Sequence, residues 1–425
     1  MKNNNAQQNI PQGWKFDELG IFIADFGDGG TPSRSNGEYF GGEIPWVVIK
    51  DIKPIITKTQ STLTQKGLKN SSAKLWPTGT IILSFGATIG EVGIAGIPVA
   101  TKQGIAGIVP TKELLNSFLY YLLLNNKGRL QQLSSGSTIK EVRPAVIKKQ
   151  IKVFVPPIKE QQKIAEILGA VDEDIAKTQG VIEATEKLKK GLMQQLFTRG
   201  INHTKFKKTK LGEIPEEWKL TSLQEMIDNG IVVSHLDGNH GELYPKASEF
   251  IDNGVPYLSA NCIEDGSVNF HKAKYLSLER ASKFIKGVAV DGDILFAHNA
   301  TVGPIAILKI KEKYVILSTT LTYYRCNEDK LVAAYLRYYM ESDLFSDQYR
   351  RVMAQSTRNQ VPITMQRTFL HILPKYAEQQ KIAEILLAVD EKISINKKLK
   401  NKLILLKKGL MQDLLSGRVR VKFNE

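Results

Sequence analysis

Apolar residues recur every three or four positions along two long stretches of the chain, and shorter runs fill the remainder. The first stretch, residues 158–197, keeps its apolar residues on one helical face, which predicts a helix of roughly 39 residues, about 58 Å long at ~1.5 Å per residue. The second stretch, residues 378–415, spaces its leucines from Leu399 to Leu410 by four and three, as coiled coils do. Because neither helix can leave an apolar face in water, we expect the two to pack against each other.

Shorter runs predict a mixed α/β domain before each long helix. The β-branched and apolar residues at 45–49, 80–83 and 151–155 have the length and composition of strands. Shorter helices are expected at 114–133 in the first domain and at 331–345 in the second. The predicted fold class is therefore α+β (mixed).

The chain is two copies of one unit. Glu160–Asp172 returns as Glu378–Asp390 with a single substitution and an offset of 218 residues, and a Trp-Lys pair opens each domain at Trp14 and Trp218. Such a repeat dictates the architecture. Between these anchors the copies have diverged, which is typical of two domains of one fold that recognise different things. Plain duplication followed by drift is the alternative.

The segment between the first long helix and the second domain decides the direction of the helices. A parallel pair would need a return of about 58 Å, which roughly 20 residues could not comfortably span while also entering a fold. We therefore predict two globular domains separated by two long antiparallel α-helices, with a pseudo-twofold internal repeat. The predicted boundaries are residues 1–157 for the first domain, 158–198 for the central spacer helix, 199–213 for a basic linker, 214–376 for the second domain, 377–416 for the C-terminal spacer helix and 417–425 for a basic tail.

The charge of the chain indicates its partner. A formal net charge of +15 and a pI near 9.4 favour a polyanion, most simply nucleic acid, and an anionic membrane surface or plain solubility are the alternatives. The two cysteines, Cys262 and Cys326, lack CxxC spacing, which argues against a zinc site and a disulfide framework. The N-terminus is polar, and glycines and a proline interrupt the least polar window, residues 80–100. These features argue against a signal peptide and a membrane span, so a cytoplasmic protein is expected.

Sequence motifs that carry catalysis are missing. The sequence has no GxxxxGK[ST] phosphate loop and no [DN]-P-P-[YF] tetrapeptide of the kind that amino-methyltransferases use. His235, Asp237, His240 and Glu242 could be drawn as a metal cluster, but a polar turn is the better interpretation. We therefore expect no catalytic residue, no metal site and no cofactor bound by this chain.

Reading base edges requires Arg, Lys, Asn, Gln, Ser and Thr side chains on loops. Two segments, residues 136–138 and 356–358, are the strongest candidates because the repeat places them equivalently. The predicted nucleic-acid contacts over both domains are Thr31, Ser33, Arg34, Lys50, Lys102, Gln103, Ser137, Thr138, Lys140, Ser234, His298, Asn299, Thr319, Thr357, Arg358 and Asn359.

Several motifs point to one family. They are Gly-Gly-Thr-Pro-Ser-Arg at 29–34, Ile-Pro-Glu-Glu-Trp-Lys at 214–219, and Pro-Pro-Ile-Lys-Glu-Gln-Gln-Lys-Ile-Ala at 156–165, of which the last six residues return at 378–383. Over almost its whole length, the chain resembles the specificity (S) subunit of type I restriction-modification enzymes. The second domain departs from the pattern, because residues 232–238 stand where a second Gly-Gly-Thr-Pro-Ser loop would be.

The resemblance implies that each domain is a target recognition domain that reads one half of a split double-stranded DNA sequence. The paired helices would act as a spacer and dock two methyltransferase (M) subunits, and restriction/translocase (R) subunits would join through the complex. S-adenosylmethionine, ATP and Mg²⁺ would then be bound by the partner subunits. The docking candidates are the helix starts, Glu160, Gln161, Lys163, Ile164, Glu378, Gln379, Lys381 and Ile382.

Two other interpretations stay open at this point. A helical scaffold or adaptor protein with a basic nucleic-acid-binding surface would share the charge and the helices, and specific binding to one split duplex would distinguish it. A methyltransferase or nuclease with its own recognition domains would need the missing catalytic motifs, and cofactor binding by the isolated chain would reveal it.

Overall fold

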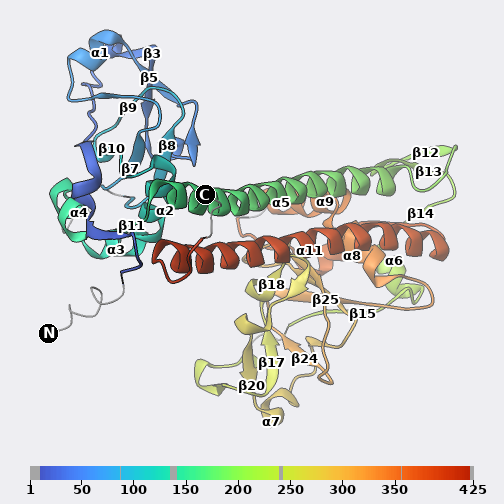
Figure 1. Ribbon diagram of the computed structural model, residues 1–425. Coiled ribbons are helices and arrows are strands. Elements are labelled where there is room, and N and C mark those ends of the chain that lie inside the picture. Colours follow the sequence, from blue (N-terminus) through green and yellow to red (C-terminus); the bar gives the residue numbers. More distant parts are fainter. Residues whose placement is uncertain (1–9, 87, 135–140, 239–242, 356, 422–425) are drawn as a thin grey trace. The chain divides into compact units, whose positions relative to one another are not determined.

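The chain forms two compact units, and each contains one globular domain (Figure 1). Unit 1 comprises residues 1–179 and 398–425, and unit 2 comprises residues 180–397. The unit boundary passes through both long helices, so each unit holds the first half of one helix and the second half of the other. The computed structural model describes residues 10–86, 88–134, 141–238, 243–355 and 357–421.

Both predicted long helices are present. Helix α5 spans Ile158–Thr198, and helix α11 spans Tyr376–Leu415. Glu160 and Glu378 lie in the first turn of their helices, where a carboxylate interacts favourably with the helix dipole. Among the described residues, no helix combines the length and the apolar character needed to cross a membrane.

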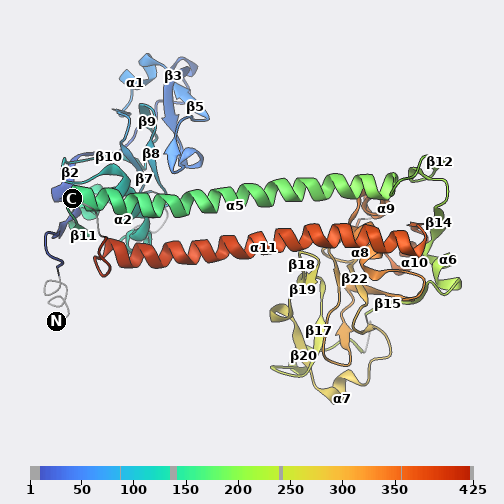
Figure 2. The same cartoon turned by 45° about the vertical axis from the view of Figure 1, so that its right-hand side comes forward.

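The two long helices run antiparallel within each unit, as predicted (Figure 2). In unit 1, Ile164 near the start of α5 shares a hydrophobic core with Leu414 at the end of α11. In unit 2, Ile382 near the start of α11 shares a core with Leu196 at the end of α5. A parallel pair would bring start against start, so these contacts establish the direction.

The globular part of unit 1 is built on two main sheets. One has the strand order β2-β10-β7-β8-β4 and the other β5-β3-β9-β6, while β1 pairs with β11 where the chain enters and leaves the domain. The elements are β1 (Lys15–Glu18), β2 (Ile23–Gly27), β3 (Phe40–Val47), β4 (Ile55–Ile56), β5 (Ser61–Leu63), α1 (Gln65–Lys69), β6 (Leu75–Trp76), β7 (Ile81–Ser84), β8 (Val92–Ala95), β9 (Val99–Thr101), β10 (Ile105–Pro110), α2 (Asn116–Asn125), α3 (Lys127–Gln132), α4 (Pro144–Gln150) and β11 (Lys152–Val155).

Unit 2 repeats this topology with additions. The sheet β15-β25-β22-β23 has the order of β2-β10-β7-β8, the run β20-β17-β24-β21 has the order of β5-β3-β9-β6, and β14 pairs with β26 as β1 pairs with β11. The elements are β12 (Phe206–Thr209), β13 (Gly212–Pro215), β14 (Lys219–Ser222), α6 (Leu223–Asp228), β15 (Val232–Asp237), β16 (Phe250–Ile251), β17 (Val255–Leu258), β18 (Ile263–Glu264), β19 (Ser267–Val268), β20 (Lys274–Leu276), α7 (Leu278–Ala281), β21 (Val288–Ala289), β22 (Ile294–Ala297), β23 (Ile305–Ile307), β24 (Val315–Leu317), β25 (Leu321–Cys326), α8 (Ala333–Glu341), α9 (Asp343–Ala354), α10 (Ile363–Gln366) and β26 (Leu370–Leu373).

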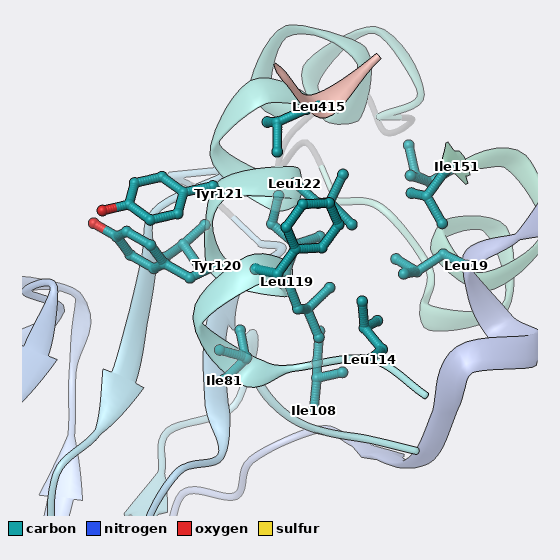
Figure 3. Close-up of a cluster of buried hydrophobic side chains, with 14 of the residues drawn as sticks. Leu19, Ile81, Ile108, Leu114, Leu119, Tyr120, Tyr121, Leu122, Ile151 and Leu415 are labelled. Carbon is teal, nitrogen blue, oxygen red and sulfur yellow. The ribbon is translucent and has the colours of Figure 1, made fainter. Parts of the chain in front are cut away.

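The main core of unit 1 joins the domain to the long helices. Figure 3 shows Leu119 and Leu122 from α2 gathered with Ile81 and Ile108 from the sheet and with Leu415 from the end of α11. All five side chains are almost fully buried, and burying each contributes roughly 1.5–3 kcal/mol. This shared core, not helix propensity alone, fixes the ends of the long helices on the domain.

Three sequence predictions need correction in detail. The single helix predicted over 114–133 is two helices, because Asn126 leaves helical geometry and its side-chain amide donates to the Leu122 carbonyl at 2.8 Å. The helix predicted near 331–345 is likewise divided, with an extended Ser342 between α8 and α9. The predicted basic linker at 199–213 contains β12 and the start of its antiparallel partner β13.

Candidate nucleic-acid interface

Several loops of unit 1 meet where β2 and β7 end and β10 begins, at one end of the strands of the sheet β2-β10-β7-β8-β4. The Phe85 N–H donates to the Gly104 carbonyl at 3.0 Å, and the Val142 N–H donates to the Phe85 carbonyl at 2.9 Å. The Gly29 N–H donates to the Ile105 carbonyl at 3.0 Å. These bonds bring together residues 28–30, 84–86, 101–104 and 141–142. With residues 31–34, which continue the glycine-rich loop, we call these segments the loop edge of unit 1.

Unit 2 builds the same edge from equivalent bonds. The His298 N–H donates to the Thr320 carbonyl at 3.0 Å, and the Val361 N–H donates to the His298 carbonyl at 2.8 Å. Asn299 forms an isolated bridge with Gln360, just as Gly86 does with Glu141 in unit 1. The loop edge of unit 2 therefore consists of residues 237–238, 298–300, 318–320 and 357–361.

Glycine stands at the same point in both loop edges, although the second domain lacks the Gly-Gly-Thr-Pro-Ser motif. The Gly238 N–H donates to the Leu321 carbonyl at 3.3 Å, as the Gly29 N–H does to the equivalent strand in unit 1. A Cβ atom at Gly29 would lie 2.2 Å from the Thr101 carbonyl oxygen, and one at Gly238 would lie 2.2 Å from that of Ser318. The close backbone approach requires glycine at both positions.

The structure brings most described candidates of unit 1 to its loop edge. Ser33 and Arg34 are exposed and Thr31 is partly exposed on the glycine-rich loop, while Lys102 and the exposed Gln103 lie on the turn before β10. Lys50 is also exposed, but it lies beyond the end of β3, outside the four segments of the edge. Three further candidates fall outside the described residues, namely Ser137, Thr138 and Lys140.

In unit 2, five candidates lie at the loop edge. Thr357, Arg358 and Asn359 are exposed, while Asn299 and Thr319 are partly exposed on neighbouring loops. The structure does not bring Ser234 to the edge. Ser234 lies within β15, where its hydroxyl is 2.8 Å from the Tyr323 hydroxyl.

His298 is a correction to the predicted contacts. Its side chain is only 2% exposed, and its Nδ1 atom lies 3.0 Å from the Val361 carbonyl oxygen. The imidazole is thus buried, with Nδ1 against the Val361 carbonyl, and is not presented to a base edge. The residue therefore supports the loop edge from beneath.

Asp28 is a residue of the loop edge that sequence analysis missed. Its Oδ1 atom accepts the Gly29 N–H at 2.7 Å and the Gly104 N–H at 2.9 Å, which ties the glycine-rich loop to the turn before β10. Burial raises the pKa of Asp28, and these two backbone donors oppose the rise. The sequence signal is an aspartate directly before a glycine pair, a common turn arrangement.

The start of each long helix is anchored to its own domain. The Trp14 indole N–H donates to Glu160 Oε2 at 3.0 Å, and Arg420 Nε donates to Glu160 Oε1 at 2.8 Å. In unit 2, the Trp218 indole N–H donates to Glu378 Oε2 at 2.9 Å, and His203 Nε2 lies 2.9 Å from Glu378 Oε1. These contacts account for a glutamate at both equivalent positions.

The glutamine that follows each of these glutamates also forms hydrogen bonds within its own domain. Gln161 Oε1 accepts the Leu115 N–H at 2.8 Å and its Nε2 donates to the Pro156 carbonyl at 2.8 Å. Gln379 makes the same pair of bonds, with the Val332 N–H at 3.0 Å and the Pro374 carbonyl at 3.1 Å.

The prediction that these side chains dock a partner therefore needs correction. Glu160, Gln161, Ile164, Gln379 and Ile382 are at most 2% exposed, so a partner could not reach them without opening their unit. Glu378 is also occupied within unit 2, by the bonds described above. The exposed members of the predicted set are Lys163 and Lys381.

The described residues contain no group of three or more His, Cys, Asp or Glu side chains that could hold a metal ion. Two members of the cluster considered from the sequence, His240 and Glu242, lie outside the part of the chain that the structure describes. His235, a third member, is buried, and burial lowers its pKa to about 3.

Two domains of one fold, each with a polar loop edge and each fixed to paired helices, define an internally duplicated protein with one equivalent polar surface in each unit. The family model described as the type I restriction modification DNA specificity domain matches residues 11–187 and 215–404. The chain therefore belongs to this family and is a specificity subunit of a type I restriction-modification system. Membership does not favour the scaffold or adaptor alternative.

Similar proteins match the whole chain or part of it. It is 27% identical to the type I restriction enzyme MjaVIII specificity subunit of Methanocaldococcus jannaschii, over 97% of this chain and 94% of that one. It is 28% identical to the EcoR124I/EcoR124II specificity subunit of Escherichia coli, over 34% and 37% of the two chains. The crystal structure of the S subunit from M. genitalium has a similar fold, with a TM-score of 0.59 at 18% identity, covering 100% and 99% of the chains.

Proposed function

We propose that each unit reads one half of a bipartite duplex DNA target through its loop edge. The observation that carries the proposal is that the two loop edges occupy equivalent places on one frame but present different chemistry. At the turn before the central strand, unit 1 has the exposed Gln103 where unit 2 has the partly exposed Thr319. Different donors and acceptors on the same frame would select different base pairs.

The charge of the chain supports duplex DNA as the ligand. With a net charge of +15, it would attract the phosphate backbone and position the loops, while the polar loop side chains would supply base discrimination. Arg34 and Arg358 are the exposed arginines of the two loop edges, and arginine is the residue that most often contacts guanine.

The proposal includes partners and excludes chemistry by this chain. Two M subunits would dock near the exposed Lys163 and Lys381, at the starts of α5 and α11, and R subunits would join through the complex. The chain itself would be non-catalytic and bind no cofactor, with S-adenosylmethionine, ATP and Mg²⁺ held by the partners. Such a complex would work in the cytoplasm, where chromosomal DNA is found.

A domain exchange tests the proposal. Residues 12–155 are replaced by the corresponding domain of a relative, and the chain is expressed with its M subunits. Sequencing of modified DNA should then show one half of the target changed and the other half retained. A hybrid that changes both halves, or an unmodified genome with the parent complex, would contradict the proposal.

A further inference from the structure

Beneath the two loop edges, the cores of the units have opposite character. In unit 1, Phe26 of β2 pairs with Ile108 of β10, and Ile147 of α4 is buried nearby in the same hydrophobic core. In unit 2, His235 of β15 pairs with Tyr324 of β25, which is the equivalent strand pair. An apolar core has therefore been replaced by a polar one at the corresponding place.

Gln366, at the end of α10, lies at the centre of this polar core. Its Oε1 atom accepts hydrogen bonds from Thr322 Oγ1 at 3.0 Å and from the Tyr324 hydroxyl at 2.9 Å, and it lies 3.1 Å from His235 Nε2. Its Nε2 atom donates to the Val361 carbonyl at 3.1 Å. Gln366 is fully buried, so each of these bonds forms without competition from water.

Histidine fits this arrangement in its neutral form. Because Gln366 Oε1 can only accept, His235 must carry its proton on Nε2. Burial lowers the pKa of His235 to about 3, so the ring stays neutral near pH 7 and the network is not a pH switch in that range.

The network extends directly to the loop edge of unit 2. The Val361 carbonyl that Gln366 binds is also 3.0 Å from His298 Nδ1, and the Val361 N–H donates to the His298 carbonyl at 2.8 Å. The loop that holds Thr357–Asn359 ends at this residue, and the Asn359 carbonyl accepts the Ala300 N–H at 3.0 Å. Gln366 therefore fixes the point from which the exposed loop projects.

We infer that Gln366 is a positioning residue for recognition of the second half-site. It acts through Val361, whose carbonyl it orients, and it does not touch DNA itself. The inference rests on the proposed function. Unit 1 has no hydrogen-bonding counterpart to Gln366, because Ile147 occupies the equivalent position and its side chain can only pack. Directional bonds in unit 2 thus take the role that side-chain shape has in unit 1.

The test compares two variants of the same network in the complete complex with M subunits. Gln366→Met removes the bond to Val361, whereas Tyr324→Phe removes one bond to Gln366 and leaves the bond to Val361 intact. Each complex selects from a library of random-sequence duplexes, at a temperature well below unfolding. Gln366→Met should lower discrimination at the second half-site by about tenfold, equivalent to ~1.4 kcal/mol, and leave the first unchanged. Tyr324→Phe should lower the melting temperature but keep discrimination at both.

Two further variants keep the test decisive if Gln366→Met folds poorly. His298→Phe introduces the residue type that unit 1 has at Phe85 and removes the other side-chain contact to Val361, so it should also weaken only second-half discrimination. Ile147→Met, at the equivalent position in unit 1, should leave both half-sites unchanged.

The outcomes separate the inference from the proposed function. If the parent complex selects no bipartite sequence, the proposed function fails. If it does select one and Gln366→Met and His298→Phe retain full second-half discrimination, the positioning role is wrong. Equal losses at both half-sites in Gln366→Met would also overturn it, because they would indicate general destabilisation.

Discussion

In both units, a lysine, an aspartate and a tyrosine join the two long helices to each other and to the domain. Unit 2 adds an arginine and a glutamate to this contact. In unit 1, Lys407 of α11 lies 2.6 Å from Asp172 of α5, and the Tyr121 hydroxyl donates to the same carboxylate at 3.0 Å. The contact thus joins both helices to α2 of the domain.

Unit 2 contains the equivalent contact within a larger ionic network. Asp390 takes the place of Asp172, with Lys189 at 2.7 Å and the Tyr338 hydroxyl at 2.7 Å. Arg337 lies 3.2 Å from Asp390 and 2.8 Å from Glu341, and Glu341 is 3.4 Å from Lys189.

The difference shows which part of the contact is essential to the fold. Tyr120 and Leu124 occupy the positions of Arg337 and Glu341 in unit 1, and Tyr120 is buried there. Buried ion pairs and well-packed apolar side chains often stabilise a fold about equally, so either solution is tolerated. Substitution of the equivalent aspartate, Asp172 or Asp390, should nevertheless reduce stability by different amounts in the two units.

The largest effect is expected from the anchor of α5. Glu160→Ala should destabilise unit 1 by about 3 kcal/mol, because it leaves the buried Trp14 indole N–H without its acceptor and removes the partner of Arg420. Urea unfolding of the purified chain measures the change. Glu166→Ala, an exposed position on the same helix, is the matched control and should fall within ~0.5 kcal/mol of the parent. Equal midpoints for the two variants would mean that the anchor does not hold the helix.

Arginine substitutions at the loop edges test whether the units recognise DNA independently. Arg34→Ala should cost roughly 1–3 kcal/mol of discrimination at the first half-site and none at the second, if the side chain contacts a base. Arg358→Ala should show the opposite pattern. Binding of duplexes that carry single base changes in either half measures both effects. A loss that is uniform across all sequences would identify a phosphate contact instead.

The repeat, the long helices and their direction could be predicted from the sequence because helical periodicity and linker length are local properties. Their ends were predicted within two residues at α5 and α11. The break at Asn126 was missed, since an apolar pattern continues through it and only one side-chain hydrogen bond interrupts the helix.

The sites could be predicted only in part, because they depend on contacts between distant segments. The near identity of the helix starts predicts a docking surface, whereas in the structure Glu160 binds Arg420, 260 residues away. Identity indicates that a residue's neighbours are retained, but not which neighbours they are. For the same reason, the burial of His298 depends on the contact between the end of β22 and the loop before α10, which no local sequence pattern predicts.

A smaller effect is expected where the two helix contacts differ. Asp390→Asn should cost about 1 kcal/mol more than Asp172→Asn, because it removes a carboxylate partner from two cations, Lys189 and Arg337, whereas Asp172→Asn removes one from Lys407 alone. Urea unfolding at pH 7 measures the difference. Equal losses of stability would mean that the ion pair with Glu341 is sufficient for Arg337.

The pH dependence of stability provides a second measurement of the Asp390→Asn variant. Burial alone would raise the pKa of Asp390, but the hydrogen bonds from Lys189 and Tyr338 and the charge of Arg337 outweigh it and lower the pKa below the ordinary 3.8. Asp390 therefore stabilises the fold above that value, and its contribution is lost as the pH falls through the folded-state pKa. Asp390→Asn should show a weaker loss of stability between pH 5 and pH 3 than the parent.

The smallest effect on the chain itself is expected at the exposed helix starts, where the consequence should appear only in the complex. Lys163→Glu should change the stability of the isolated chain by less than ~0.5 kcal/mol, because the side chain is exposed. If the two helix starts are equivalent docking faces, this single reversal should remove one M subunit, and the double reversal with Lys381→Glu should remove both. The native mass of the reconstituted complex measures the stoichiometry. Loss of both M subunits from the single variant would show that docking is coupled between the units, and an unchanged mass in the double variant would place the docking surface elsewhere on the helices.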